Sequence, residues 1–135
     1  MRRDVIVVDA SVLTNMLTYT DQRGRKARAV LSRDTRWAAP EHWKAEVFSA
    51  IRGLALGGKI TTERATWALD RLPQLGMDHV SLDDLLSRMW RLRESISGYD
   101  AAYVALAEQR GLTLTTSDAR LARAATAHCR VELVA

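Results

Sequence analysis

The sequence contains few of the residues on which several common classes of site depend. Its single cysteine, Cys129, rules out an internal disulfide and is typical of a protein in a reducing compartment. The three histidines are far apart and lack the paired spacing of a zinc site, so we expect no metal centre built on histidine and cysteine. No apolar run approaches the roughly 18 residues of a membrane span. The short apolar run near the N-terminus is also too short for a signal peptide. We therefore expect a cytoplasmic protein without membrane contact.

The overall composition is typical of a folded globular protein. The chain has 135 residues, of which 47% are hydrophobic and 27% are charged, and this balance argues against disorder. A chain of this length is large enough to bury a core as one domain. Only two prolines occur, and the sequence has no repeat and no linker-like stretch. We expect residues 1–135 to form a single domain.

The clearest feature is an apolar strand that ends on a carboxylate. Four β-branched residues, Val5 to Val8, are typical of a strand buried on both faces, and Asp9 follows them. Near the other end, the β-rich segment Leu112 to Thr116 is followed by Asp118. The carboxyl ends of parallel strands lie at one edge of a sheet, so we expect both aspartates to share one crevice. Because like charges repel, such a site implies a cation or a raised pKa.

Strand-like and helix-like segments alternate along the whole chain. This alternation predicts an α/β fold: a three-layer α/β/α domain with a mainly parallel central sheet of about five strands. Gly24 is expected to interrupt the chain before the second helix, and Gly111 to end the sixth. The predicted strands are 5–8, 37–40, 77–80, 112–116 and 131–134, and the predicted helices are 10–17, 26–32, 40–56, 61–73, 81–95, 98–110 and 118–126.

Two further acids occupy unusual positions. Glu46 falls at the edge of the core-facing arc of its helix, and a carboxylate held there is costly unless it is paired or metal-bound. Asp100 opens a helix whose next seven residues are all hydrophobic, which predicts that the helix is buried. Each of the four acids also has an ordinary explanation, since Asp9, Asp100 and Asp118 are suited to capping helices and Glu46 to a boundary position. Taken together, oxygen ligands without histidine or cysteine favour Mg²⁺ or Mn²⁺.

Three segments that cover almost the whole chain carry a family resemblance. They are VIVVDASVL at residues 5–13, PEHWKAEVFSAI at 40–51 and GYDAAYVALAEQRGLTLTTSDARLARA at 98–124. In this order they resemble a PIN domain, most closely the VapC-type ribonuclease toxins. By position, the resemblance implies that the family's acidic metal site corresponds to Asp9, Glu46, Asp100 and Asp118.

The resemblance also implies two supporting residues. Ser11 matches the family's small polar residue after the first aspartate, and Thr116 matches the hydroxyl before the last; both are expected to orient carboxylates. Some members carry a further acid shortly after the last aspartate, where this chain has Ala119 and Arg120. Whether the active state holds one metal ion or two therefore stays open.

The implied activity is that of a metal-dependent endoribonuclease. With Mg²⁺ or Mn²⁺ as cofactor, it would hydrolyse RNA phosphodiester bonds as the toxin of a toxin–antitoxin pair. The implied partners are RNA, a cognate antitoxin and a second copy of the chain, within a homodimer or a larger assembly. Two alternatives stay open: a non-catalytic PIN-like module that binds RNA or a partner, and a PIN nuclease of RNA processing.

Two other classes with an acidic Mg²⁺ pocket fit less well. A haloacid-dehalogenase-type phosphotransferase needs a second aspartate two residues after the first, where this chain has Ser11. A response-regulator receiver needs an acid pair after its first strand and a lysine late in the chain, whereas the last lysine here is Lys59.

Arginine and tryptophan are both abundant, and each admits two interpretations. With three lysines among 20 basic residues, the other 17 are arginines, and the net charge is +4. Arginine clusters either bind RNA phosphates or form an ordinary solvated surface. The tryptophans either anchor an antitoxin helix or belong to the core. The segments concerned are Arg23 to Arg36, Arg88 to Arg93, and the helices around Trp43, Trp67 and Trp90.

Overall fold

The computed structural model describes residues 4–33 and 35–135, and its centre is a parallel β-sheet. Within the described residues the sheet has five strands in the order β3-β2-β1-β4-β5, and each neighbouring pair is parallel. Val7 of the central strand is in register with Ala38 on one side and Leu114 on the other. The strands are β1 (Asp4–Val8), β2 (Thr35–Pro40), β3 (Asp78–Val80), β4 (Thr113–Thr116) and β5 (Val131–Leu133).

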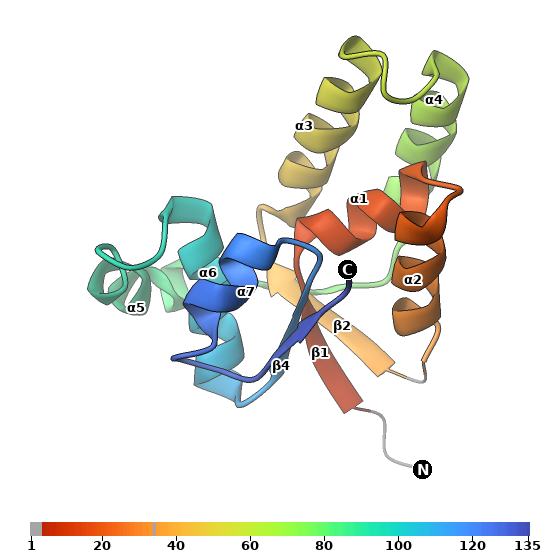
Figure 1. Ribbon diagram of the computed structural model, residues 1–135. Coiled ribbons are helices and arrows are strands. Elements are labelled where there is room, and N and C mark those ends of the chain that lie inside the picture. Colours follow the sequence, from red (N-terminus) through yellow and green to blue (C-terminus); the bar gives the residue numbers. More distant parts are fainter. Residues whose placement is uncertain (1–3, 34) are drawn as a thin grey trace.

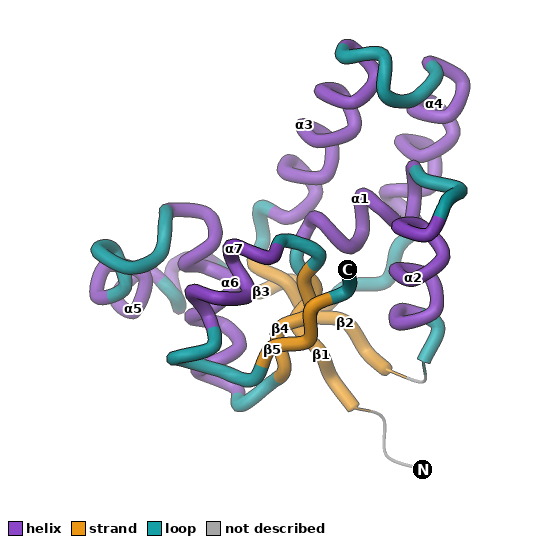
Figure 2. The backbone as a smooth tube through the Cα atoms, viewed as in Figure 1, coloured by secondary structure: helices purple, strands orange, loops and turns teal. Residues whose placement is uncertain are grey.

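Helices cover both faces of this sheet, as Figures 1 and 2 show. Because parallel crossovers are almost always right-handed, the helices that precede β2 and β3 lie on one face and those that precede β4 and β5 on the other. This arrangement confirms the predicted three-layer α/β/α fold. The helices of the described residues are α1 (Ala10–Thr18), α2 (Gln22–Leu31), α3 (Trp43–Leu56), α4 (Thr62–Arg71), α5 (Leu86–Arg91), α6 (Gly98–Arg110) and α7 (Ala119–Ala125), with 3₁₀ turns η1 (Leu72–Gln74) and η2 (Leu82–Asp84).

The strand order fixes where a site can form. The chain leaves β1 toward one face of the sheet and leaves β4, the neighbour of β1, toward the other. Such a switch point opens a crevice at the carboxyl ends of the two strands, where α/β proteins bind their ligands. The residues at this crevice follow Val8 in β1 and Thr116 in β4.

The core is built on β1 and α6. Val7 and Val8 are completely buried, as four β-branched residues in a row predict. On α6, all seven residues from Ala101 to Ala107 are buried, so the prediction of an apolar, enclosed helix is confirmed. Gly111 ends this helix with a φ of +63°, a left-handed conformation that glycine adopts without strain. The buried part of α6 begins directly after Asp100 and so fixes where Asp100 lies.

The prediction that Gly24 interrupts the chain before the second helix is wrong. The structure places Gly24 inside α2, which begins at Gln22. Gly24 is buried against the preceding loop, and a Cβ atom there would lie 1.8 Å from the carbonyl oxygen of Tyr19. The absence of a side chain at Gly24 therefore allows two backbone segments to pack closely, and Gly24 does not break the helix.

Two other helix boundaries differ from the sequence pattern. Helix α3 starts at Trp43 and not near Pro40, because Pro40 is still paired with Val80 in the sheet and the Glu41 N–H donates to the Val80 carbonyl at 2.8 Å. The predicted helix 81–95 is divided into η2 and α5. In the part of the chain that the structure describes, no helix is long and apolar enough to cross a membrane.

Gly24 in α2 and Gly53 in α3 should respond oppositely to replacement by alanine. At Gly24 the added methyl group collides with backbone, so we expect Gly24→Ala to lower the free energy of unfolding by about 1–3 kcal/mol. At Gly53 in α3, an added Cβ atom would have no neighbouring atom within 4 Å. Gly53→Ala should therefore raise the free energy of unfolding by about 0.5–1 kcal/mol, because alanine has a higher helix propensity than glycine. Urea denaturation of both variants measures the difference. Equal stabilisation by the two substitutions would contradict the close packing at Gly24.

Candidate active site

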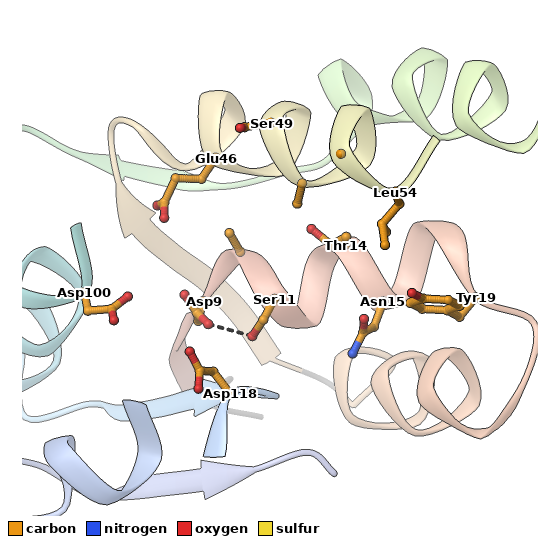
Figure 3. A pocket seen from close by; sticks show the side chains of 13 residues that line it. Asp9, Ser11, Thr14, Asn15, Tyr19, Glu46, Ser49, Leu54, Asp100 and Asp118 are labelled. Atoms are coloured by element: carbon orange, nitrogen blue, oxygen red, sulfur yellow. Dashed lines mark hydrogen bonds between the residues drawn. The ribbon is translucent and has the colours of Figure 1, made fainter. Parts of the chain in front are cut away.

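Four acids from distant parts of the sequence line one cleft, which lies between α1 and α3. Its volume is about 490 Å³. Asp9 follows β1, Asp118 precedes α7, and Glu46 and Asp100 lie in the first turns of α3 and α6. Figure 3 shows their carboxylates directed toward a common space. The structure thus brings together all four acids that the sequence singles out.

Asp9 is the most deeply buried of the four, with 4% of its surface exposed. Its Oδ2 accepts hydrogen bonds from the Ser11 hydroxyl at 2.6 Å and from the Thr116 hydroxyl at 2.8 Å. Although Asp9 precedes α1, its side chain makes no helix-capping hydrogen bond. The capping explanation therefore does not account for Asp9.

Of the other two aspartates, one caps a helix and the other does not. Asp118 does cap its helix, because its Oδ1 accepts from the N–H groups of Arg120 and Leu121 at 2.9 and 3.3 Å. Asp100 lies inside α6, whose N-cap is Ser97. Asp100 is therefore not an N-cap, and its carboxylate points into the cleft (Figure 3).

Ser11 and Thr116 tie the two strand ends together. The Ser11 hydroxyl accepts from the Ser117 N–H at 2.9 Å, and the Thr116 hydroxyl accepts from the Asp118 N–H at 3.0 Å. Both hydroxyls also donate to Asp9, so each one joins a residue after β1 to the segment after β4. These two side chains fix the position of one carboxylate relative to the backbone of the other.

The cleft disfavours negative charge. Burial raises the pKa of Asp9, and burial together with the Asp9 and Asp118 carboxylates raises the pKa of Asp100. Burial is also the main cause that raises the pKa of Glu46 from 4.5 to about 7, and the charges of Asp9 and Asp100 add to it. The acids therefore lie near enough to repel one another, and a bound cation would relieve that repulsion.

Tyr103 and His42 adjoin Glu46, and the sequence pattern identifies neither. The fully buried Tyr103 donates its hydroxyl to Glu46 Oε1 at 2.7 Å and so opposes the rise in the pKa of Glu46. Burial, with Glu46, raises the pKa of Tyr103, so its hydroxyl stays a donor. His42 Nε2 lies 3.0 Å from the same oxygen but outside hydrogen-bond geometry, and burial lowers the pKa of His42. From the sequence alone, Tyr103 would be assigned to the hydrophobic core. Its position one helical turn after Asp100 is the one sequence feature that could have indicated a place near the acids.

The donor set suits a hard divalent cation. All four side chains offer carboxylate oxygens, which Mg²⁺ and Mn²⁺ prefer. Among the described residues, no group of three or more acidic, histidine or cysteine side chains lies close enough to hold one ion as placed. Mg²⁺ is usually bound through one or two carboxylates and keeps several water molecules. The cleft therefore fits such an ion through one or two carboxylates and water, and not as a cage of four.

The clustered arginines are largely engaged within the protein. Arg23 pairs with Asp21 at 2.6 Å, and Arg28 donates to the carbonyls of Met16 and Tyr19. The remaining pairs join different elements: Arg33 with Glu132, Arg36 with Asp78, and Arg88 with Glu108. Arg120 lies beside the cleft. The pKa of Asp100 is raised, mainly by burial, and the positive charge of Arg120 partly opposes that rise.

Without metal, the stability of the protein should fall as pH rises. Glu46 binds its proton more tightly in the folded state, so this stabilisation is complete below about pH 4.5 and is lost as pH rises through about 7. The shift is worth about 3 kcal/mol at most. Urea denaturation in EDTA between pH 5 and 8 should show a smaller fall for Glu46→Gln than for wild type. Glu63→Gln, at an exposed position on α4, should keep the wild-type slope; identical slopes for all three proteins would contradict the burial of Glu46.

The comparisons with known proteins agree with the fold. The PIN domain model matches residues 6–127. Ribonuclease VapC3 of Mycobacterium tuberculosis (strain H37Rv) is 41% identical over 119 residues, which cover 88% of this chain and 86% of the relative. Ribonuclease VapC1 of the same strain is 36% identical over 136 residues, with coverage of 97% and 98%.

A solved structure shows the same fold at lower identity. The crystal structure of M. tuberculosis VapC20, described as a sarcin-ricin loop cleaving toxin, superposes with a TM-score of 0.64 at 20% identity. The superposition covers 88% of this chain and 94% of VapC20. Since the family model spans most of the sequence and the VapC relatives align along nearly their whole length, the chain belongs to the PIN-domain family and, within it, to the VapC proteins.

Proposed function

We propose that this protein is a Mg²⁺- or Mn²⁺-dependent endoribonuclease that hydrolyses RNA phosphodiester bonds in the acidic cleft. One observation carries the proposal: Asp9 is buried at the switch point, held by two hydroxyls and surrounded by three further carboxylates. The named activities of VapC3, VapC1 and VapC20 support RNA as the substrate.

The residues of the cleft have distinct tasks in this proposal. A bound divalent cation would lower the pKa of water and neutralise the charge that develops on the phosphate. Asp9 and Asp118, joined through Ser11 and Thr116, are the carboxylates that would hold it. Glu46 and Asp100, which border the same cleft, would bind the ion or hold a water molecule bound to it, and Tyr103 fixes the orientation of Glu46.

Removing the buried carboxylate should abolish activity without unfolding the protein. In wild type, millimolar Mg²⁺ or Mn²⁺ should raise the melting temperature, because only the native state gathers the acids. Asp9→Asn keeps the shape of the side chain and removes its charge, so it should respond less to metal and should lose RNA cleavage. Thermal melting and cleavage of mixed cellular RNA, each with and without EDTA, measure the two effects.

Two results would contradict this assignment. A wild-type melting temperature that is indifferent to metal would argue against a cation site. Cleavage that persists in EDTA, or in Asp9→Asn, would remove the cleft from the reaction. Asp70→Asn, on α4 and outside the residues that line the cleft, is the matched control and should behave as wild type in both measurements.

We further propose that the protein acts in the cytoplasm as the toxin of a toxin–antitoxin pair, as a homodimer alone or in a larger assembly with its antitoxin. The name of VapC20 as a toxin supports this role. The α3–α4 hairpin exposes large apolar side chains: Phe48 is 49%, Leu56 71% and Trp67 40% exposed. Trp43, by contrast, is completely buried, so of the two interpretations given for the tryptophans it belongs to the core.

Mixing the protein with the product of the neighbouring gene should abolish RNA cleavage and give a stable complex on size exclusion. A partner that covers the cleft excludes substrate, so inhibition and complex formation should occur at the same stoichiometry. A neighbouring gene product that neither binds nor inhibits would contradict the toxin role and leave the nuclease activity intact. A protein that is monomeric alone would contradict the homodimer.

A further inference from the structure

Tyr99 is a large aromatic residue that the fold leaves in solvent beside the acidic cleft. It directly precedes Asp100 in the first turn of α6, and 69% of its surface is exposed. Its ring lies 5.2 Å from that of His42 at an angle of 36°. Such exposure gives Tyr99 little part in the core. Its position beside Asp100 places an aromatic surface at the rim of the proposed active site.

The Tyr99–His42 pair is supported from inside the protein. The His42 ring meets the ring of buried Tyr103 edge-on, with centroids 5.7 Å apart. Tyr103 in turn donates its hydroxyl to Glu46. An aromatic series thus runs outward from the proposed catalytic carboxylate to the surface, in the order Tyr103, His42, Tyr99. The inner two rings hold the outer one in a defined place.

Two hollows open on this aromatic pair and continue from the acidic cleft. One, of about 550 Å³, is bounded by His42, Tyr99 and the apolar side chains Leu82 and Met89. The other, of about 490 Å³, is bounded by His42, Tyr99 and residues of α3. Glu46 borders both hollows as well as the acidic cleft, and Asp100 borders the first hollow and the cleft. A ligand in the cleft therefore has an aromatic, partly apolar surface directly beside it.

The charge of the cleft explains why such a surface is needed. Carboxylates repel the phosphates of RNA, and most arginines of the two clusters are paired within the protein or bonded to its backbone. Binding energy must then come partly from groups that do not depend on phosphate charge. Aromatic side chains provide it by stacking on unpaired bases, and this contact tolerates any base because each has a π-face.

We propose that Tyr99, backed by His42, stacks on an unpaired nucleobase next to the phosphate that is cleaved. This inference rests on the proposed ribonuclease function and defines the substrate further, as RNA that is single-stranded or looped at the cleavage point. In a duplex the bases are stacked on one another and offer no face to the side chain. Tyr99 is thus a binding residue and does not take part in the chemical step.

The test separates binding from chemistry. We expect Tyr99→Ala to raise KM for a single-stranded RNA oligonucleotide about 5- to 150-fold, the loss that corresponds to one stacked base, with kcat nearly unchanged. Tyr99→Phe keeps the ring and should retain the wild-type KM. Trp90→Ala is the matched control, because Trp90 is an aromatic residue with similar exposure, 67%, that does not line the hollow. Equal melting temperatures would show that the variants fold.

A second readout reports stacking directly. An RNA oligonucleotide that carries 2-aminopurine at successive positions should lose fluorescence at one position when it binds wild type or Tyr99→Phe in the presence of Ca²⁺. Tyr99→Ala should abolish that quenching. Quenching that depends on Tyr99 would support the stacking site even if no RNA were cleaved. The absence of cleavage would refute only the nuclease activity.

Other results would overturn the stacking site while leaving the nuclease intact. One is cleavage of RNA by Tyr99→Ala with the wild-type KM and undiminished quenching. Another is a variant whose sole defect is weaker binding of the co-encoded antitoxin, which would assign the exposed ring to a protein partner. A third is an equal rise in KM for Trp90→Ala, which would show that the effect is not particular to the hollow.

Discussion

A buried carboxylate at the end of the central strand is the constraint around which the rest of the site is organised. Asp9 is 4% exposed, and burying a charge is costly unless other groups satisfy it. Two hydroxyls do so: Ser11 follows Asp9 in the first turn of α1, and Thr116 lies beside Asp9 because β4 pairs with β1 in parallel. The sheet register, the hydroxyls and the direction of the carboxylate are therefore one connected arrangement. A shift of β4 by one residue would turn Thr116 away from Asp9.

Negative charge in the cleft is unfavourable, because the carboxylates are buried and because they lie close to one another. Glu46 and Asp100 come from helices on opposite faces of the sheet, yet both lie near enough to Asp9 that its charge adds to the effect of burial and raises their pKa values. The buried residues Ala101 to Ala107 of α6 fix the position of Asp100, which directly precedes them. Repulsion among these carboxylates favours the binding of a divalent cation, which competes with protons for the same oxygens. The same repulsion applies to phosphates, which is why contacts outside the cleft matter for a polyanionic substrate.

The sequence predicts much of the fold and the four acids, because both depend on local patterns. A run of β-branched residues identifies β1, and an uninterrupted apolar stretch identifies α6 as buried; the acids follow from their places at strand ends and helix starts. What the sequence does not predict depends on contacts between distant segments. Tyr103 reaches Glu46 across 57 positions, and Arg33 reaches Glu132 across 99, and no local periodicity encodes either pair. The role of Gly24 also depends on a contact that the sequence pattern does not encode. A side chain is excluded there because the backbone of Tyr19 lies against it in the folded protein.

The hydrogen bond from Thr116 to Asp9 joins residues 107 positions apart, and that separation has a consequence for how the protein is made. The central strand leaves the ribosome before β4, so its carboxylate lacks the Thr116 hydroxyl until β4 has been translated. Parallel pairing cannot occur before both strands exist, and contacts of such long sequence separation form late. Until then the nascent chain carries an incomplete cleft. For a protein proposed to cut the RNA of the cell that makes it, activity cannot begin before β4 and the residues around Asp118 have been translated.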